Sequence, residues 1–157
     1  MILIRTTDVS RVTRAIQQAL TEWDALADKP VEITRAAERN TDPNRCPWVG
    51  IYRTGVDYGE APRVMGLGSG YRRQRMDFAV VVQAADPTSG EECEDRLEPL
   101  IQEVTSALLS DVSLRGTVLT IDSFAVRYEN YERVGGSYFQ EAVVFFSATQ
   151  NTSATDV

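Results

Sequence analysis

The residues of this chain that could do chemistry are few and lie far apart in the sequence. Cys46 could act as a nucleophile only with a neighbouring base, and the 157 residues include no histidine. A small loop or core thiol is the simpler interpretation of Cys46. The carboxylates of residues 91–95 could form a metal or acid–base site, but the helix dipole alone favours acidic residues at a helix start. The sequence therefore predicts no catalytic residue, no metal and no cofactor.

A glycine-rich stretch at 66–70 is the one motif that could cradle a phosphate. It lacks the full spacing of a dinucleotide-binding loop and precedes a strand, whereas such loops open a helix. A hinge is the better interpretation. The formal net charge of −7 argues against nucleic-acid binding as the main function, because nucleic-acid binders usually carry a basic face. DNA could still pass close by, since an acidic wall repels the duplex and leaves it mobile.

The compartment follows from two further patterns. No apolar run reaches the roughly 20 residues of a membrane span, and no apolar leader of signal-peptide type precedes Cys46 and Cys93. We therefore expect a protein made and assembled in a cytoplasm with both thiols reduced.

Two amphipathic helices must position these residues. The first is predicted from a cap at Thr7 or Asp8 to an end at 29–30, with apolar residues at three- and four-residue spacing. Its apolar positions are Val9, Val12, Ile16, Ala19, Leu20, Trp23 and Leu26. The second follows a turn at 86–89 and carries the stripe Cys93, Leu97, Leu100, Ile101, Val104 and Leu108. Pro99 lies off that stripe, so we expect a kink or a restart of the helix there.

Strands are predicted at 31–35, 48–52, 71–84 and 138–149, and residues 117–133 are extended but too long to be one regular strand. In 71–84 the even positions from Met76 to Val82 are apolar and most odd positions are polar, which indicates one buried face and one wet or partner-facing face. The inward parity of 117–133 changes near Asp122 and Ser123, as a β-bulge or bend would produce. Residues 134–137 predict a hairpin turn. The second half of the last strand is apolar on both sides, which predicts a place in the middle of the sheet between covered faces, or under a neighbouring subunit.

The elements together predict one α+β domain over residues 1–150, with a mainly antiparallel sheet and two amphipathic helices packed largely on one face. Residues 54–70 form a long loop that is mobile or is ordered by something outside the domain. Residues 151–157 form a polar C-terminal tail.

Two groups of residues are candidates for contacts between subunits. Arg73 and Arg75 share the face opposite the apolar one. They form either a solvated face or an ion-paired contact with Glu91 and Glu92 of another copy. The tyrosines around the final hairpin are either cross-strand packing pairs or residues where subunits meet. They are Tyr128, Tyr131 and Tyr138.

Several loose motifs recur together along residues 9–149. The stretch 44–52 carries Asn44, Arg45, Pro47, Trp48 and Tyr52, and a later closure carries Leu114, Gly116, Thr117 and Val118. With the first helix, the acidic-capped second helix and the tyrosine-bearing hairpin, this pattern resembles the tail terminator (tail completion) proteins of tailed bacteriophages. None of these motifs is a catalytic signature.

The resemblance implies a structural virion protein that forms a homohexameric ring on the tail tube, ends tube polymerisation and joins the tube to the head–tail connector. Its implied partners are copies of itself, the tube protein, the connector and, in a contractile tail, the sheath protein. It implies no cofactor, no membrane and no sequence-specific DNA binding. The 54–70 loop, with Tyr58, Arg63 and Met65, is the candidate contact to tube or connector.

Two alternatives remain open at the level of sequence. One is a head-completion or connector adaptor of the phage neck, which belongs to the same class of virion proteins. The other is a small acidic enzyme or ligand-binding module that uses Cys46 or the carboxylates of 91–95.

Overall fold

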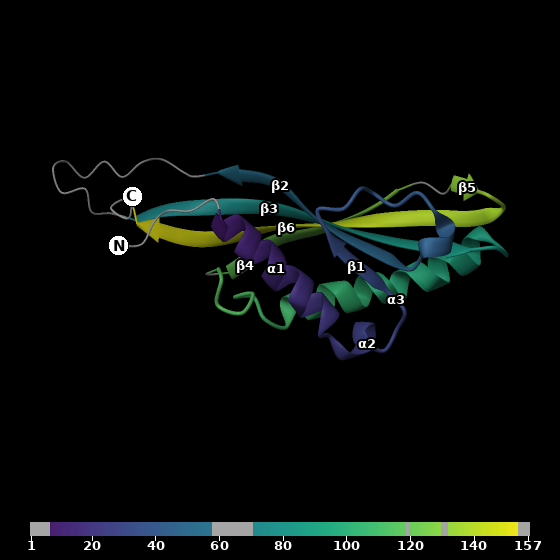
Figure 1. Cartoon of the computed structure of the whole chain (residues 1–157), viewed down its shortest axis with the longest axis horizontal. Coiled ribbons are helices and arrows are strands. Elements are labelled where there is room, and N and C mark those ends of the chain that lie inside the picture. Colours follow the sequence, from purple (N-terminus) through teal and green to yellow (C-terminus); the bar gives the residue numbers. More distant parts are fainter. Residues whose placement is uncertain (1–6, 58–70, 119, 130–131, 154–157) are drawn as a thin grey trace.

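Two long strands form the centre of the fold. The computed structural model describes residues 7–57, 71–118, 120–129 and 132–153. In it β3 (Tyr71–Asp86) and β6 (Ser137–Ser153) pair antiparallel from Tyr71 opposite Ser153 to Asp86 opposite Tyr138. The other strands are β1 (Glu32–Arg35), β2 (Trp48–Asp57), β4 (Thr120–Tyr128) and β5 (Glu132–Val134). Figure 1 shows that the N-terminal end of β3 and the C-terminal end of β6 extend beyond the helices.

The sheet has the order β1-β2-β3-β6-β4, and β5 pairs with β6 off this path. Among the described strands, every pairing is antiparallel except the parallel contact of β1 with β2. The predicted α+β class with a mainly antiparallel sheet is confirmed. The central place of the last strand is also confirmed, because β6 lies between β3 and β4.

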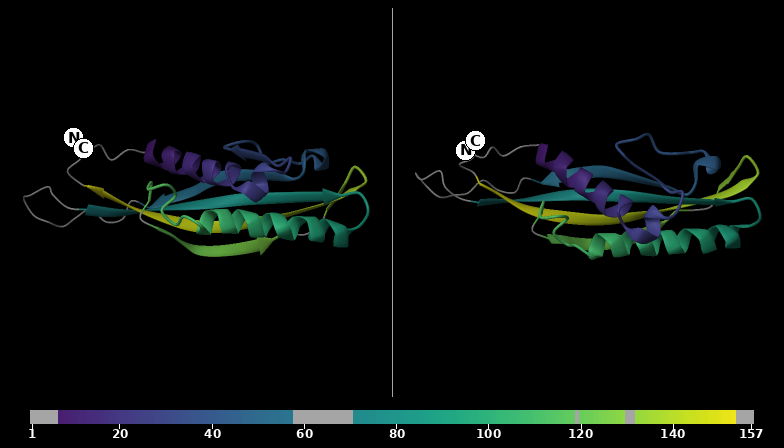
Figure 2. Two further views of the ribbon diagram at one scale, coloured as in Figure 1. Left: turned by 90° about the horizontal axis from the view of Figure 1, so that it is seen from below. Right: turned by 60° about the horizontal axis from the view of Figure 1, so that its bottom comes forward.

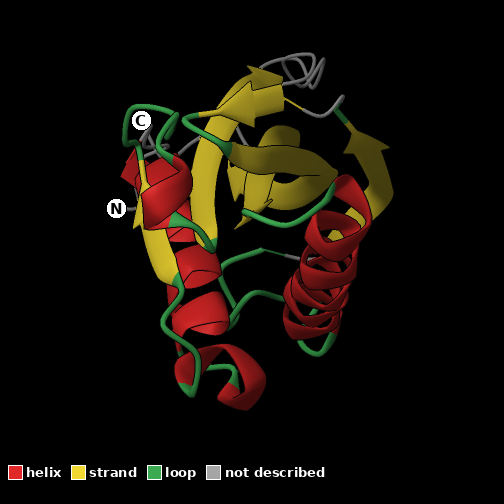
Figure 3. Ribbon diagram, turned by 90° about the vertical axis from the view of Figure 1, so that its right-hand side faces the viewer, coloured by secondary structure: helices red, strands yellow, loops and turns green. Residues whose placement is uncertain are grey.

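The helices pack on one face of the sheet, as Figures 2 and 3 show. They are α1 (Thr7–Thr21), α2 (Asp24–Ala27) and α3 (Gly90–Leu109). The prediction of one continuous first helix is wrong, because Trp23 adopts an extended backbone between α1 and α2. The break brings the Trp23 indole to α3, where its Nε1 donates to Glu103 at 2.7 Å.

The second helix matches its prediction closely. Ser89 caps it by accepting a hydrogen bond from the Glu92 backbone N–H at 3.1 Å, and the whole predicted stripe is buried. A restart at Pro99 is wrong, since α3 continues through that residue as one helix. Pro99 lies on the exposed side of the helix, away from the buried stripe.

The main core fills the space between the helices and the even-numbered side of β3. Met76, Phe78, Val80 and Val82 are all at most 1% exposed, as the alternation predicted. Phe78 and Phe124 each stack on Phe146, with ring centroids 5.5 and 5.2 Å apart.

The opposite face of the sheet is drier than the sequence predicted. A second apolar cluster there joins Trp48, Ala79, Val81 and Val143, all of them buried. The side predicted to be wet or partner-facing is instead covered within the subunit at Ala79 and Val81, the two apolar residues that interrupt its polar alternation. The cause is local: Gly50 has no side chain, so the Trp48 ring lies over it and covers the neighbouring strands.

Two predicted irregularities are confirmed. The register of β4 shifts between Asp122 and Ala125, and Ser123 has φ 56°, which is a β-bulge at the predicted parity change. Gly135 and Gly136 have φ values of 58° and 86°, so the 134–137 hairpin turns through two left-handed residues as predicted.

Two predicted boundaries are wrong. β2 continues to Asp57, so residues 54–57 belong to a strand and not to the 54–70 loop; residues 58–70 lie outside the described part. β6 continues to Ser153, so residues 151–153 are paired with β3 and not a tail; residues 154–157 lie outside the described part. Residues 151–153 pair with the polar end of β3, where no apolar alternation marks a strand, and residues 55–57 pair with Asp77, Met76 and Arg75.

Candidate functional site

The predicted charged contact falls on two distant parts of the molecule. Arg75 is exposed on β3 and lies 3.4 Å from Asp77 of its own strand. Arg73 lies two positions earlier in β3, and its side chain is outside the described part. Glu91 and Glu92 are exposed in the first turn of α3. At about 3.3 Å per residue, β3 separates Arg75 from the α3 end of the strand by roughly 36 Å. The two groups can therefore meet only between copies.

The tyrosines divide into two environments. Tyr128, the last residue of β4, is 52% exposed, and its hydroxyl donates to Glu98 of α3. That hydrogen bond to a carboxylate raises the pKa of Tyr128. Tyr138 is half-buried against the core, with the Arg133 guanidinium 4.9 Å from its ring centroid. Packing within the subunit accounts for Tyr138, whereas Tyr128 remains available to a partner.

The other predicted contact residues lie outside the described part of the chain. They are Tyr131 and the three loop residues Tyr58, Arg63 and Met65.

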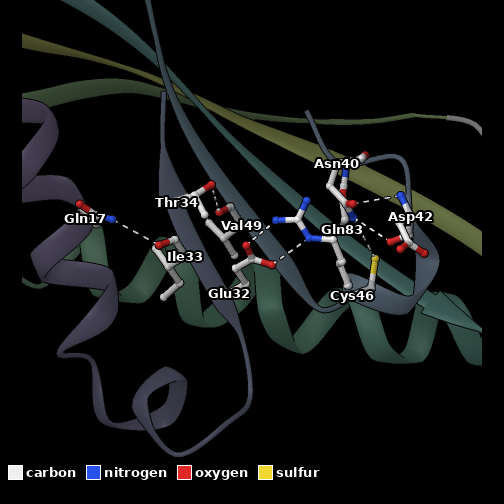
Figure 4. Close-up of polar contacts among 10 residues, drawn as sticks. Gln17, Glu32, Ile33, Thr34, Asn40, Asp42, Cys46, Val49 and Gln83 are labelled. Carbon is white, nitrogen blue, oxygen red and sulfur yellow. Dashed lines mark hydrogen bonds and ion pairs between the residues drawn. The ribbon is translucent and has the colours of Figure 1, made fainter. Parts of the chain in front are cut away.

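The two edges of the sheet differ in how they are covered. β1 is only four residues long, and the side-chain amide of Gln17 on α1 donates to the Ile33 carbonyl at 3.3 Å (Figure 4). β4 is nine residues long, and no described strand pairs with its outer side. Val126 and Tyr128, on this strand, are 38% and 52% exposed. Short length and side-chain cover protect the β1 edge from pairing. β1 pairs only with Trp48–Ile51 of β2, so the described open edges are Tyr52–Asp57 of β2 and the longer β4. We call the outer side of Thr120–Tyr128 the β4 edge.

A buried polar cluster holds segment 36–47 on the face opposite the helices. Asn40 Nδ2 donates to Gln83 Oε1, and Gln83 Nε2 donates to the Asn40 carbonyl, both at 2.9 Å (Figure 4). Gln83 also donates to Glu141 at 3.0 Å, and Arg39 pairs with Glu141 at 2.6 Å. A cavity of about 590 Å³ lies beside the cluster, lined among others by Arg39, Glu129 and Glu141. Sequence analysis missed this cluster, although a lone glutamine after the apolar run of β3 was a signal.

The two thiols are poor nucleophiles in this fold. Burial raises the pKa of Cys46 to about 12, so its sulfur stays protonated at neutral pH. The Asn40 side-chain amide donates to Cys46 Sγ at 3.9 Å. Cys93 is fully buried, burial also raises its pKa, and it donates to the Ala84 carbonyl.

The carboxylates of 91–95 do not converge. Among the described residues, no group of three or more histidine, cysteine or acidic side chains is placed to hold a metal ion. Within the same residues, no helix has the length and apolar character to cross a bilayer.

Comparison with known proteins adds no assignment: no family model matches the chain, and no curated protein matches it significantly.

Proposed function

We propose that the protein assembles with copies of itself into a ring that caps the tail tube of a tailed bacteriophage. The ring ends tube polymerisation and presents a surface to the head–tail connector. In this proposal the protein is a component of the virion tail or neck and performs no reaction. Copies of the chain, tube protein and connector are its partners, together with sheath protein in a contractile tail.

The contrast between the two edges of the sheet carries the proposal. The β1 edge is short and capped by Gln17, whereas the β4 edge is long and bears two exposed apolar side chains, Val126 and Tyr128. A nine-residue edge that no described strand covers is a surface suited to another subunit. If the β4 edge meets a different surface of the next copy, the contact is head-to-tail and closes into a ring when the rotation permits.

Two further features support the proposal. The charged groups at Arg75 and at Glu91 and Glu92 lie at opposite ends of β3, which suits contacts between copies. The net charge of −7 suits a channel for DNA, because an acidic wall does not grip the duplex.

Native mass spectrometry of the purified protein, alone and with tail tubes, tests self-assembly. We expect hexamers, or monomers that become hexameric at a tube end. Immunogold electron microscopy tests position, and we expect label at the head-proximal end of free tails. Label on tailless capsids and not on tails would instead identify a head-completion or connector adaptor. A protein that stays monomeric with tubes and is absent from virions would refute the proposal.

A further inference from the structure

A second cavity lies under the open edge of the sheet. It has a volume of about 440 Å³ and is lined by Glu94, Leu97, Glu98, Tyr128 and Gln140. Three elements contribute: α3 supplies three of these residues, β4 ends at Tyr128, and β6 supplies Gln140. The hydrogen bond from Tyr128 to Glu98 joins α3 to β4 at this point. We call this the Tyr128 cavity.

The polar lining of the Tyr128 cavity consists mainly of hydrogen-bond acceptors. Glu94 and Glu98 bring two carboxylates, and neither forms a described ion pair. The Tyr128 hydroxyl donates its hydrogen bond to Glu98, so its oxygen can serve a ligand only as an acceptor.

Gln140 provides independent evidence that the cavity lacks a hydrogen-bond donor. The residue is 6% exposed, its amide nitrogen donates to the Glu129 carbonyl, and its Oε1 is buried without a hydrogen-bond partner. A buried acceptor left unpaired costs free energy, so a donor that reaches it is favoured.

The matching ligand is cationic, carries several N–H donors and has an apolar stem. Arginine meets all three conditions, since its planar guanidinium carries five donors and pairs strongly with carboxylates. Leu97, 1% exposed, forms an apolar wall for the stem, and the exposed Tyr128 ring offers a face for stacking.

Two arginines that could enter the cavity of a neighbouring copy lie on the strands at the end of the sheet opposite β4. Arg35 at the end of β1 and Arg53 in β2 are exposed, form no described ion pair, and line one small cavity together. The strand order places β1 and β2 at one side of the sheet and β4 at the other. Neighbouring copies placed side by side in one direction would therefore bring these arginines to the Tyr128 cavity. A contact between two different surfaces of this kind is the geometry that generates rings.

We propose that the Tyr128 cavity receives an arginine side chain, Arg35 or Arg53, from a second copy of the chain. This inference rests on the proposed self-assembly and names the surfaces that make it.

Charge reversal tests the inference, with assembly measured by sedimentation velocity and native mass spectrometry at matched concentrations. We expect the double variant Glu94→Arg/Glu98→Arg to weaken self-association roughly tenfold or more, and Arg35→Glu/Arg53→Glu to do the same. The fourfold variant that combines them should recover assembly, because the reversed charges again match. Circular dichroism of each variant checks that a loss of assembly is not a loss of fold.

The matched control reverses Asp24 and Asp28, two exposed acidic residues that form no described ion pair and do not line the cavity. We expect Asp24→Arg/Asp28→Arg, which changes the net charge by the same amount, to assemble like the wild type. If this control loses assembly while Glu94→Arg/Glu98→Arg retains it, the Tyr128 cavity is not the interface and the inference is wrong. A wild type that assembles and is insensitive to all reversals overturns the inference alone. A wild type that stays monomeric, even with tubes, overturns the proposed function as well.

Discussion

Substitution of Gly50 by alanine tests how the face of the sheet opposite the helices is built. A Cβ at position 50 would lie 2.4 Å from Cη2 and 2.7 Å from Cζ3 of the Trp48 ring, and 3.0 Å from Cε2 of Tyr52. Contacts this short are not tolerated, and Trp48 is fully buried, so the ring must leave its place or the strand must bend. Overpacking of this kind costs about 1–3 kcal/mol. For a domain of this size, that lowers the melting temperature by roughly 2–12 °C.

The same strand offers a matched control. A Cβ at Gly55 would meet nothing closer than Asp77 Oδ2 at 3.5 Å, which is an ordinary contact. Gly55→Ala should therefore leave stability unchanged or raise it by up to about 1 kcal/mol, because alanine lowers the conformational entropy of the unfolded chain. Thermal and urea unfolding, followed by far-ultraviolet circular dichroism, measure both variants.

The same Gly50→Ala substitution made in a Trp48→Leu variant tests whether the Trp48 ring causes the loss of stability. When Trp48 is already leucine, the added methyl group at position 50 loses its closest neighbour, and most of the penalty should disappear. The reasoning is refuted if Gly50→Ala and Gly55→Ala unfold at the same temperature, or if the cost of Gly50→Ala is the same with and without Trp48.

Two further predictions concern buried polar groups. Gln74 is fully buried with neither side-chain polar atom hydrogen-bonded, so Gln74→Met should stabilise the fold by about 1–3 kcal/mol in urea unfolding. Gln83→Met, which removes three hydrogen bonds, should destabilise it, and the opposite order would contradict this reasoning. Hydrogen bonds from the Thr88 and Ser89 backbone, with Arg96 nearby, lower the pKa of Asp86 below 3.8. Because the folded pKa is the lower one, this stabilisation is complete above about pH 5 and is lost as pH falls through the folded pKa. Wild type should therefore exceed Asp86→Asn in stability at pH 6, with the gap narrowing toward pH 2; a constant gap would exclude the carboxylate charge as its cause.

Elements with a strong local pattern could be predicted from the sequence. The stripe of α3, the alternation in β3 and the two glycines of the β5–β6 turn each depend on neighbouring residues, and the structure confirms them. The bulge at Ser123 was predictable for the same reason, because an inserted residue changes the parity of the side chains that follow.

Features that depend on distant residues could not be predicted. The break at Trp23 accompanies a hydrogen bond from its indole to Glu103, 80 residues away on another helix. The Tyr128 cavity depends on a hydrogen bond between β4 and α3, 30 residues apart in the chain. Segment 36–47 is held by Asn40 and Gln83, which are 43 positions apart. In each case the local sequence carries the residues but not their partners.

The β3–β6 ladder has a mechanical consequence. Its hydrogen bonds run across the two strands along their whole shared length, so tension along the strand axis loads many of them at once. Peeling the strands apart from one end would break the same bonds one after another at far lower force. The subunit should therefore resist stretching along its long axis and yield most easily to a sideways pull at a strand end.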